Sequence, residues 1–583
     1  MFIARRLYIY ATSFISLMML VGGLSYLLNL LLKDWLALAQ SYYYSSLQDQ
    51  YSQAGAIAVV GGVVWLIHWI LAQRSARAKD SHGIEERQSG LRKLMLYFTL
   101  FVTAIQVFTA AGRLLADILT QIARGVGNLN YSLVDNIPVL LVNAPVWLYF
   151  WLVIRADNRI APDTGYKANV RRLYFFLMNY GAVTALTISV AILGQDCWQY
   201  ISSSNNSYYR NNNFLGVIAP VTALVIVSLA GWLWHWWQVE RLNATSEEEQ
   251  HSLLRKFYLY YLLFQTIAVT ITAFAVFIYN LMRLALNSEA MKNSSEPLLT
   301  QVGNPLVVAL AFGIFWGYHA VVLHRDMELV AKEPPLQANL RRLYWYLLTL
   351  IGFVVLSVGL ARLIRIMLDV ALGGSDSTAL KRTGWSDEIS LLVTLILVGG
   401  GLWFYSWLKL QRQSLAQEHA EERRSTVRRI YLYLVLFMSV VTLLISGATL
   451  IYLVFRNIGS SFTSSFTSSI CWALGITLTA GLWLVYHLWV LLKDQKANKV
   501  GDVRTGQAAV AADFRPEVTT LVFIRGRDTA LIAGKIAQLQ RQLPADYTIE
   551  SLPAANLNLD WLRASLVGQT QNKDSGSAPE SGL

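Results

Sequence analysis

The chain has 583 residues, of which 55% are hydrophobic and only 14% are charged, and its formal net charge is +12. A soluble domain carries about 25% charged residues, and here the apolar residues fall in blocks of about twenty or more, the length that spans a bilayer. This composition excludes a soluble enzyme, a disordered protein and a small secreted disulfide scaffold. The basic residues cluster between the apolar blocks, which indicates topogenic charge rather than a nucleic-acid surface.

The first apolar block follows Arg5 and Arg6 and ends near Leu32. It is longer than the apolar core of a signal peptide, and no small-residue cleavage site follows it. We therefore expect a retained first membrane span.

A basic pair followed by aromatic residues and an apolar stretch recurs six times. The copies begin at Arg5, Arg92, Arg171, Arg255, Arg341 and Arg428, at spacings of 79 to 87 residues. Each copy predicts two spans: one that starts at the basic pair, and a second near 56–72, 136–154, 217–237, 305–323, 389–408 and 470–491. The sequence therefore predicts an all-α integral membrane protein with twelve transmembrane helices, built as six tandem two-helix repeats.

The predicted repeats occupy residues 1–90, 91–169, 170–252, 253–338, 339–425 and 426–499. A soluble composition follows, and it predicts a small cytoplasmic βαβ-like tail over 500–568. Its strands are expected at 518–524 and 547–552 and its helices at 529–543 and 559–566. Residues 569–583, rich in Ser, Gly and Gln, are expected to be a disordered end.

Orientation follows from the distribution of Lys and Arg. The segments on the side of the basic pairs hold 29 of these residues, and the loops on the opposite side hold 8. The positive-inside rule therefore predicts that both termini are cytoplasmic, with the protein in the plasma (inner) membrane.

Most second spans end in tryptophans spaced i and i+4, which share one helix face. Tryptophan favours the headgroup level of a bilayer. We expect these side chains to be interfacial anchors: Trp65, Trp69, Trp147, Trp151, Trp232, Trp236, Trp316, Trp403, Trp407 and Trp483.

The repeated Arg-Arg-Leu-Tyr opening, seen at Arg5–Tyr8, Arg171–Tyr174 and Arg341–Tyr344, resembles an uncharacterised family of bacterial multi-pass membrane proteins. This family, a domain of unknown function common in Chloroflexota-type bacteria, carries the two-span unit in tandem. The resemblance covers roughly residues 5–492. It implies a plasma-membrane location and tandem duplication, and it brings no catalytic or binding residue.

A larger duplication is also suggested, because Arg113 follows Arg92 by the same 21 positions that separate Arg362 from Arg341. This spacing predicts two six-helix halves, each built from three repeats.

Polar residues inside the spans are candidates for an intramembrane pathway. Two pairs have i, i+4 spacing, Arg113 with Asp117 and Arg365 with Asp369, whereas Arg362 has no acid at i+4. The alternative is that these arginines snorkel to the outer headgroups and form local ion pairs. Four amide side chains interrupt other spans and are either pathway groups or interhelical hydrogen-bonding groups: Gln106, Asn143, Asn179 and Gln265.

Four histidines lie at nearly equal positions near the ends of second spans: His68, His235, His319 and His487. Equal depth would suit haem ligation, but the second layer of histidines that a membrane bis-histidine haem usually has is missing. We therefore expect interfacial anchoring, with no cofactor and no metal. Cys197 and Cys471 are expected on the outer side, either as a disulfide or as two thiols.

Three functions remain open. A membrane scaffold or sensor-like interaction protein, with the lipid bilayer and an unidentified membrane or cytoplasmic protein as partners, explains the absence of deep charges and the presence of a soluble tail. A transporter or channel explains the suggested halves and the intramembrane arginines. An enzyme is disfavoured, because no HExxH motif, paired acids or nucleophile–base set appears, and a nucleic-acid partner is not expected.

Overall fold

The computed structural model describes residues 3–36, 46–125, 131–202, 213–329, 333–372, 384–415, 420–458, 464–511 and residue 538. The chain divides into two units, Met1–Val500 and Gly501–Leu583, and almost all described residues belong to the first. The described residues are almost entirely helical and contain no strand. Within them, 12 helices are long and apolar enough to cross a membrane, in agreement with the predicted spans.

Each repeat forms one helical hairpin of two long helices. The first four hairpins are α1 (Ile3–Trp35) with α2 (Leu47–Ala76), α4 (Gly90–Arg124) with α5 (Tyr131–Ile160), α6 (Ala168–Ser202) with α8 (Phe214–Thr245), and α10 (Leu253–Ala285) with α12 (Leu298–Glu328). In the fifth, α13 (Pro335–Ala371) pairs with α15 (Trp385–Thr394), which continues through a π-helical turn at Leu395–Gly399 into α16 (Gly400–Leu415). The sixth consists of α18 (Thr426–Arg456) and α19 (Ser464–Ala511).

Short elements connect the hairpins. Three short helices precede the even-numbered hairpins: α3 (Ser81–Arg87), α9 (Glu247–Gln250) and α17 (Ala420–Arg424). A 3-10 turn at Gly165–Lys167 precedes α6, and α11 (Glu289–Lys292) lies between α10 and α12. Helices α3, α9 and α17 each carry a glutamate that pairs with arginines of the preceding hairpin: Glu86, Glu249 and Glu422.

Local sequence signals explain where helices begin and end. Ser46 and Asp49 form a capping box at the start of α2, so that two backbone N–H groups of the first turn are satisfied. Pro335 opens α13, where a missing N–H costs nothing. Gly125 follows α4 with a φ of 67°, a left-handed conformation that favours glycine.

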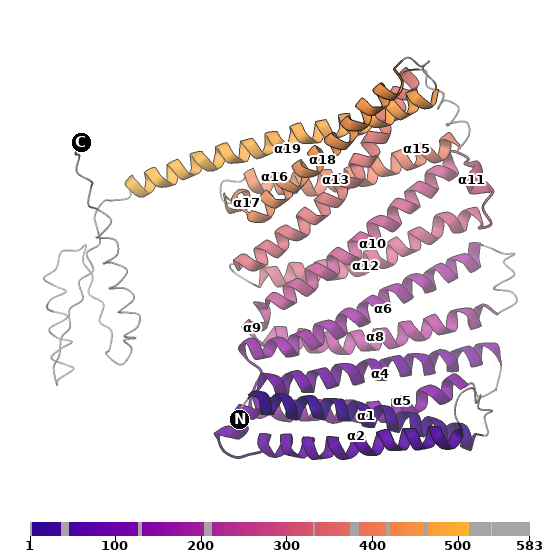
Figure 1. The fold of residues 1–583 in the computed structure, drawn as a ribbon, viewed down its shortest axis with the longest axis vertical. Coiled ribbons are helices and arrows are strands. Elements are labelled where there is room, and N and C mark those ends of the chain that lie inside the picture. Colours follow the sequence, from indigo (N-terminus) through magenta and orange to yellow (C-terminus); the bar gives the residue numbers. More distant parts are fainter. Residues whose placement is uncertain are drawn as a thin grey trace. The chain divides into compact units, whose positions relative to one another are not determined.

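Neighbouring hairpins pack against each other in chain order. The first helix of one hairpin contacts the second helix of the next: α1 contacts α5, α4 contacts α8, α6 contacts α12, and α10 contacts α15. Figure 1 shows the same order, with the pairs following one another from α1 and α2 to α18 and α19. The contacts therefore step from repeat to repeat, as in repeat proteins, in which each unit touches mainly its neighbours.

Glycines allow close helix approach within hairpins. A Cβ atom at Gly61 of α2 would lie 2.6 Å from the backbone N of Leu20 on α1. In the fifth hairpin a Cβ at Gly399 would lie equally close, at 2.6 Å, to the backbone N of Leu356. Both glycines belong to runs of small residues, Gly61–Gly62 and Gly399–Gly401, a pattern that favours close contact between membrane helices.

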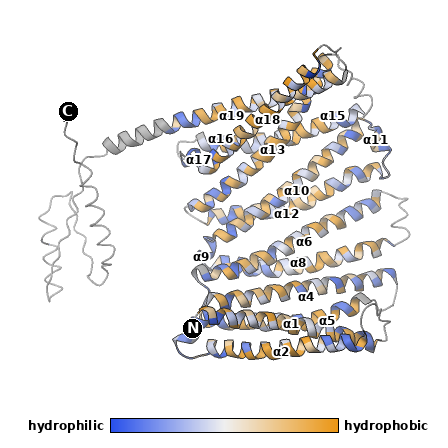
Figure 2. Ribbon diagram, viewed as in Figure 1, coloured by the Kyte–Doolittle hydropathy of each residue, from blue (hydrophilic) through white to orange (hydrophobic). Residues whose placement is uncertain are grey.

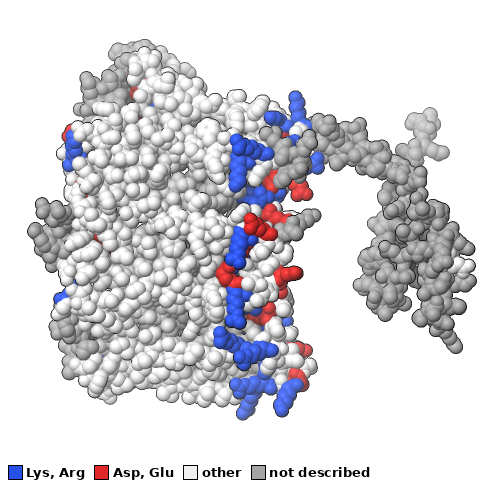
Figure 3. All heavy atoms as spheres, turned by 180° about the vertical axis from the view of Figure 1, so that it is seen from behind, with Lys and Arg blue, Asp and Glu red and all other residues white. Residues whose placement is uncertain are grey.

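The hydropathy of the helices changes along their length. Figure 2 shows hydrophobic residues along the long helices and hydrophilic residues gathered towards their ends. Large apolar side chains such as Val63 and Ile314 point outward, with 55% and 71% of their surface exposed. Such outward apolar surface suits contact with lipid. Figure 3 shows Lys, Arg, Asp and Glu side chains concentrated along one edge of the helices, with few along the opposite edge.

Little of the predicted tail falls within the described residues. Helix α19 continues to Ala511, so residues 500–511 are helical, and the described residues show no α/β tail. Apart from residue 538, the strands and helices predicted between 518 and 566 lie outside the described residues, and so does the end predicted to be disordered, 569–583.

Candidate functional site: a threefold charged layer

The most distinctive feature of the structure is a layer of buried basic and acidic side chains, here called the charged layer, at the ends of the helices that carry the basic pairs. Arg92, Arg255 and Arg428 are its centres, with 0%, 2% and 1% of their surface exposed. Each begins the first long helix of an even-numbered hairpin. A buried guanidinium is strongly unfavourable unless it is paired and hydrogen-bonded.

Each of these arginines has the same kinds of partner. An aspartate on the second helix of the same hairpin accepts a hydrogen bond from Nε, and a Gln or Glu side chain from the preceding hairpin accepts another. The aspartate distances are Arg92–Asp157 2.8 Å, Arg255–Asp326 2.6 Å and Arg428–Asp494 2.7 Å, and the second acceptors are Gln73 at 3.1 Å, Glu240 at 2.7 Å and Gln411 at 3.2 Å.

A tryptophan completes each centre. The three guanidinium groups lie 5.8, 5.5 and 5.7 Å from the ring centroids of Trp69, Trp236 and Trp407, within cation–π range. The indole N–H groups in turn donate to a tyrosine hydroxyl of the following hairpin, at 2.6 Å to Tyr149, 2.8 Å to Tyr318 and 2.6 Å to Tyr486. Each centre therefore links two hairpins.

The odd-numbered hairpins contribute arginines to a second type of pair. Their partner is a glutamate on the short helix before the next hairpin, six residues ahead of its basic pair. The distances are Arg6–Glu86 2.8 Å, Arg172–Glu249 3.0 Å and Arg342–Glu422 2.8 Å. In the second and third cases the preceding arginine pairs with the same glutamate, at 2.5 Å for Arg171 and 2.9 Å for Arg341.

Loop acids connect these groups across successive repeats. Asp163 pairs with Lys93 of the second hairpin and lies 3.8 Å from Arg171 of the third. Glu333 likewise pairs with Arg341, at 3.1 Å, after the fourth hairpin. The charged layer therefore runs across all six hairpins.

Glu422 and Glu248 are two of the acids that lie outside the membrane-spanning helices, on the short helices α17 and α9. Burial raises the pKa of Glu422, but the hydrogen bond from Arg342 and the charge of Arg341 outweigh it, so the pKa lies below its ordinary value. Burial also raises the pKa of Glu248, but the hydrogen bonds from Arg172 and the Gly165 backbone, together with the charges of Arg172 and Arg171, outweigh it and lower the pKa. The arrangement thus favours ionised carboxylates in fixed ion pairs. Among the described residues of the layer there is no nucleophile next to a base. The described residues also contain no group of three or more His, Cys, Asp or Glu side chains that could hold a metal.

The pairing pattern alternates between odd and even hairpins, so the structural repeat is a block of four long helices. The first block contains α1, α2, α4 and α5; the middle block contains α6, α8, α10 and α12; and the third contains α13, α15–α16, α18 and α19. This threefold recurrence corrects the predicted division into two six-helix halves. The spacing shared by Arg113 and Arg362 concerns one residue in each of two hairpins. The ion pairs recur in every odd-numbered or every even-numbered hairpin and therefore define the repeat.

The histidines lie inside the helix packing. His235, His319 and His487 are fully buried, and Nδ1 of each lies within 3.0 Å of the carbonyl oxygen four residues earlier. His68 is half-buried, makes the same contact at 2.8 Å and lies 3.2 Å from the Tyr8 hydroxyl. For the three buried rings, this position replaces the predicted interfacial anchoring, which requires an exposed side chain.

The tryptophans need a similar correction. Six of the predicted anchors are buried with at most 9% of their surface exposed: Trp69, Trp232, Trp236, Trp403, Trp407 and Trp483. They pack between helices, where a neighbouring helix offers the indole apolar contact, and for Trp69, Trp236 and Trp407 it also offers a tyrosine hydroxyl as acceptor. The other four, Trp65, Trp147, Trp151 and Trp316, are half-buried and stay predicted anchors.

The predicted pathway residues gather only in the third block. Arg362 donates to Glu388 of α15 at 2.8 Å, so its partner lies on the neighbouring helix. Arg365 lies 3.6 Å from both Asp369 and Glu388. Both guanidinium groups lie against Trp472, at 5.5 and 4.7 Å from its ring centroid. We call these five side chains the opposite-end cluster, because they lie away from the charged layer.

The remaining candidates are dispersed. Arg113 and Gln106 are exposed on α4, Asp117 and Gln265 are half-buried, and none of these four joins the opposite-end cluster. Asn143 and Asn179 are buried and donate to backbone carbonyls of their own helices at 2.8 and 2.9 Å. No disulfide joins Cys197 and Cys471.

The acidic half of the charged layer was not predicted from the sequence alone. A usable signal was present, because Glu86, Glu249 and Glu422 each precede an even-numbered basic pair by the same distance. The aspartates were harder to find, since Asp157 and Asp326 follow their arginines by different numbers of residues.

Comparison with known proteins agrees with the threefold block. A family model described as a domain of unknown function (DUF5671) matches the chain three times in tandem, over residues 6–142, 172–318 and 342–482. Each match begins at the second arginine of an odd-numbered hairpin and extends into the second hairpin of a block. No curated protein and no solved structure matches the chain.

Proposed function

The chain belongs to the DUF5671 family, and on that premise we propose that it is a membrane scaffold, a sensor-like interaction protein that holds partner proteins at the membrane. The observation that carries the proposal is the charged layer, which ties each hairpin to the next through buried ion pairs such as Arg172–Glu249. Buried ion pairs contribute little net stability, but they can specify one register of neighbouring elements. A row of helices held in a single register suits a platform for other proteins.

The hydrogen bonding of polar side chains within the spans supports the same function. Thr103, Asn143 and Thr266 each donate to a carbonyl of their own helix at 2.8 Å. A transport pathway needs polar groups that face a shared cavity and a substrate. Side chains that are satisfied within their own helix do not provide one.

We further propose that the charged layer faces the cytoplasm of a bacterial cell and that the membrane is the plasma membrane. The excess of Lys and Arg on this side, 29 against 8, supports this orientation. Both termini would then be cytoplasmic, together with the α/β tail predicted for residues 500–568.

The scaffold proposal is tested by purifying the full chain from native membranes in mild detergent and measuring the stoichiometry of co-purifying proteins. We expect at least one membrane or cytoplasmic protein at a fixed ratio that survives a salt wash. The matched control is Arg362→Leu, which alters the opposite-end cluster and leaves the charged layer intact, so the same partner should be retained. If the wild-type chain and the Arg362→Leu variant both purify without any other protein, the proposal is contradicted.

A transporter or channel is the second candidate, and the opposite-end cluster favours it. Arg362, Arg365 and Glu388 form a polar group next to the π-helical turn at Leu395–Gly399, and such turns are frequent at functional sites. A flux assay in proteoliposomes distinguishes the two candidates. Under the transporter hypothesis Arg362→Leu lowers the flux while insertion stays normal; under the scaffold hypothesis the wild-type chain gives no flux above empty vesicles.

A further inference from the structure

The middle block departs from the other two at one aromatic position of the charged layer. Four residues after the second arginine of the odd-numbered hairpins stand Tyr10, Phe176 and Tyr346. The Tyr10 hydroxyl donates to Glu86 at 2.5 Å and accepts from Arg92 Nη1 at 3.5 Å. The Tyr346 hydroxyl accepts from Arg428 Nη1 at 3.3 Å. Phe176 has no hydroxyl, so the equivalent arginine, Arg255, has no such acceptor.

Several buried polar atoms of the middle block lack hydrogen-bond partners among the described residues, and two of them concern this position. One is Nη1 of Arg255, a residue that is only 2% exposed, and the other is Oδ1 of Asn243, which is 6% exposed. The first can donate and the second can accept. Both residues line one pocket together with Phe176.

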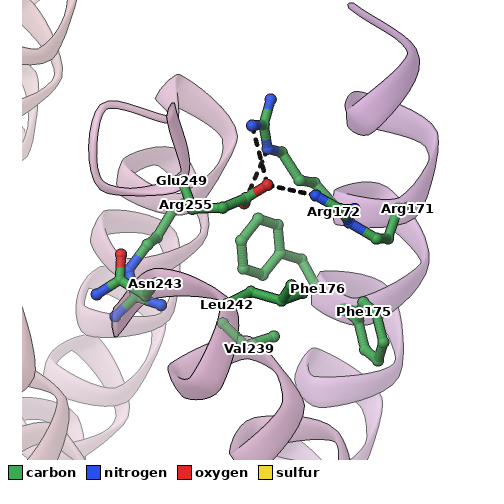
Figure 4. A pocket seen from close by; sticks show the side chains of 9 residues that line it. All are labelled: Arg171, Arg172, Phe175, Phe176, Val239, Leu242, Asn243, Glu249 and Arg255. Carbon is green, nitrogen blue, oxygen red and sulfur yellow. Dashed lines mark hydrogen bonds and ion pairs between the residues drawn. The ribbon is translucent and has the colours of Figure 1, made fainter. Parts of the chain in front are cut away.

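Figure 4 shows how this pocket is built. Asn243 and Arg255 lie on one side of it, and the ion pair between Arg172 and Glu249 lies on the other. Phe176 and Leu242 lie between them, so that the apolar part of the wall separates the two charged groups. The space is enough for about a single water molecule.

The charges around the pocket favour a neutral ligand. Arg171 and Arg172 already pair with Glu249, and Arg255 pairs with Asp326 and Glu240. Where the first and third blocks have a glutamine, the middle block has Glu240, so Arg255 faces one more carboxylate than its counterparts do. A phosphate or carboxylate would compete with these acids and exceeds the space.

We infer that the pocket binds one water molecule, which accepts a hydrogen bond from Arg255 Nη1 and donates one to Asn243 Oδ1. The water takes the role that the tyrosine hydroxyl has in the other two blocks. Buried waters characteristically satisfy polar groups in this way, with two to four hydrogen bonds each. In the middle block the arginine is thereby hydrogen-bonded to a water that can exchange with solvent. In the first and third blocks the equivalent arginine is hydrogen-bonded to the hydroxyl of Tyr10 or Tyr346, which is part of the chain.

X-ray radiolytic labelling of the full chain in detergent tests this inference, because hydroxyl radicals form at bound water and oxidise the nearest side chains. Phe176, Tyr10 and Tyr346 are comparably buried, at 7%, 3% and 5% exposure, so the two tyrosines are internal controls. We expect Phe176 to be oxidised several-fold faster than either tyrosine, after correction for the intrinsic reactivity of the two ring types. Oxidation of Phe176 no faster than that of the tyrosines would overturn the inference.

Two variants sharpen the result. Asn243→Leu removes the acceptor and should lower the oxidation rate of Phe176. In F176Y the new hydroxyl should occupy the pocket, so the oxidation rate at position 176 should fall to that of Tyr10. An unchanged rate in folded forms of both variants would contradict a bound water. The wild-type comparison remains decisive if a variant does not fold.

Discussion

Arg92 donates from Nε to Asp157 Oδ2 over 2.8 Å, and only 0% and 8% of the two side chains are exposed. The pair joins the start of α4 to the end of α5 and therefore closes the second hairpin. Its counterparts, Arg255–Asp326 and Arg428–Asp494, close the fourth and sixth hairpins in the same way. The even-numbered hairpins thus share one closing contact, and the odd-numbered hairpins have a different one.

Removing the acid of this pair should be strongly destabilising. Asp157→Ala leaves the Arg92 guanidinium buried with its main counter-charge gone, and we expect the free energy of unfolding to fall by about 3–5 kcal/mol. Thermal and denaturant unfolding in detergent measure the change. The matched control is Glu289→Gln, which breaks the exposed pair with Lys292 and should cost less than about 1 kcal/mol. Equal effects of the two substitutions would show that the Arg92 pair is not effectively buried.

Replacing both charges of the pair should be milder than replacing one. In the double variant Arg92→Met with Asp157→Leu no unpaired charge remains, and apolar replacements of buried ion pairs are often neutral or stabilising. We expect the double variant to unfold at a higher temperature than Asp157→Ala. A double-mutant cycle should give a coupling energy of about 0.5–3 kcal/mol. Additive losses would argue against a direct interaction.

Gly61 should tolerate no side chain. A Cβ there lies 2.6 Å from a backbone atom of α1, which cannot rotate away, so Gly61→Ala must separate the two helices. Overpacking of this kind costs about 1–3 kcal/mol. Gly55 is the control on the same helix, because a Cβ there meets nothing within 4 Å. Gly55→Ala should be neutral or slightly stabilising, since alanine favours helices, and the difference in melting temperature between the two variants decides the matter.

Glu422 should make the stability of the third block depend on acid pH. Its pKa in the folded chain is lower than its ordinary value of 4.5 because Arg342 and Arg341 favour the carboxylate. A group with a depressed folded pKa contributes stability above its unfolded pKa and loses that contribution as the pH falls through the folded value. Stability should therefore fall below about pH 4.5, and Glu422→Gln should flatten this part of the curve. The exposed neighbour Glu421 is the control, and Glu421→Gln should leave the curve unchanged.

Several elements of the fold could be predicted because they depend on patterns within one helix. The six basic pairs and the length of the apolar stretches predict the hairpins, and the described helices confirm all twelve spans. Small-residue runs predict close helix approach, as found at Gly61 and Gly399. These predictions needed no knowledge of which helices are neighbours.

The candidate site could be predicted only in part. The basic residues at Arg92 and Arg172 were evident from their repetition, but their acidic partners lie 65 and 77 residues further along the chain. The sequence also did not predict that Trp69 and His235 are buried between helices. Lipid tails and neighbouring helices are equally apolar, so hydropathy does not tell which face of a membrane helix meets protein.

The sequence by itself determined the helices of this protein, their hairpin order and the concentration of basic residues at one end, because chain-local periodicity and composition specify these features. Only the tertiary structure decided that Arg92, Arg255 and Arg428 are buried in ion pairs, that the repeating block has four helices, and that Phe176 lines a pocket with two buried polar atoms that have no hydrogen-bond partner among the described residues. These features depend on contacts between side chains far apart in the chain. Their geometry is set by how the hairpins pack, and no pattern within a single helix encodes it.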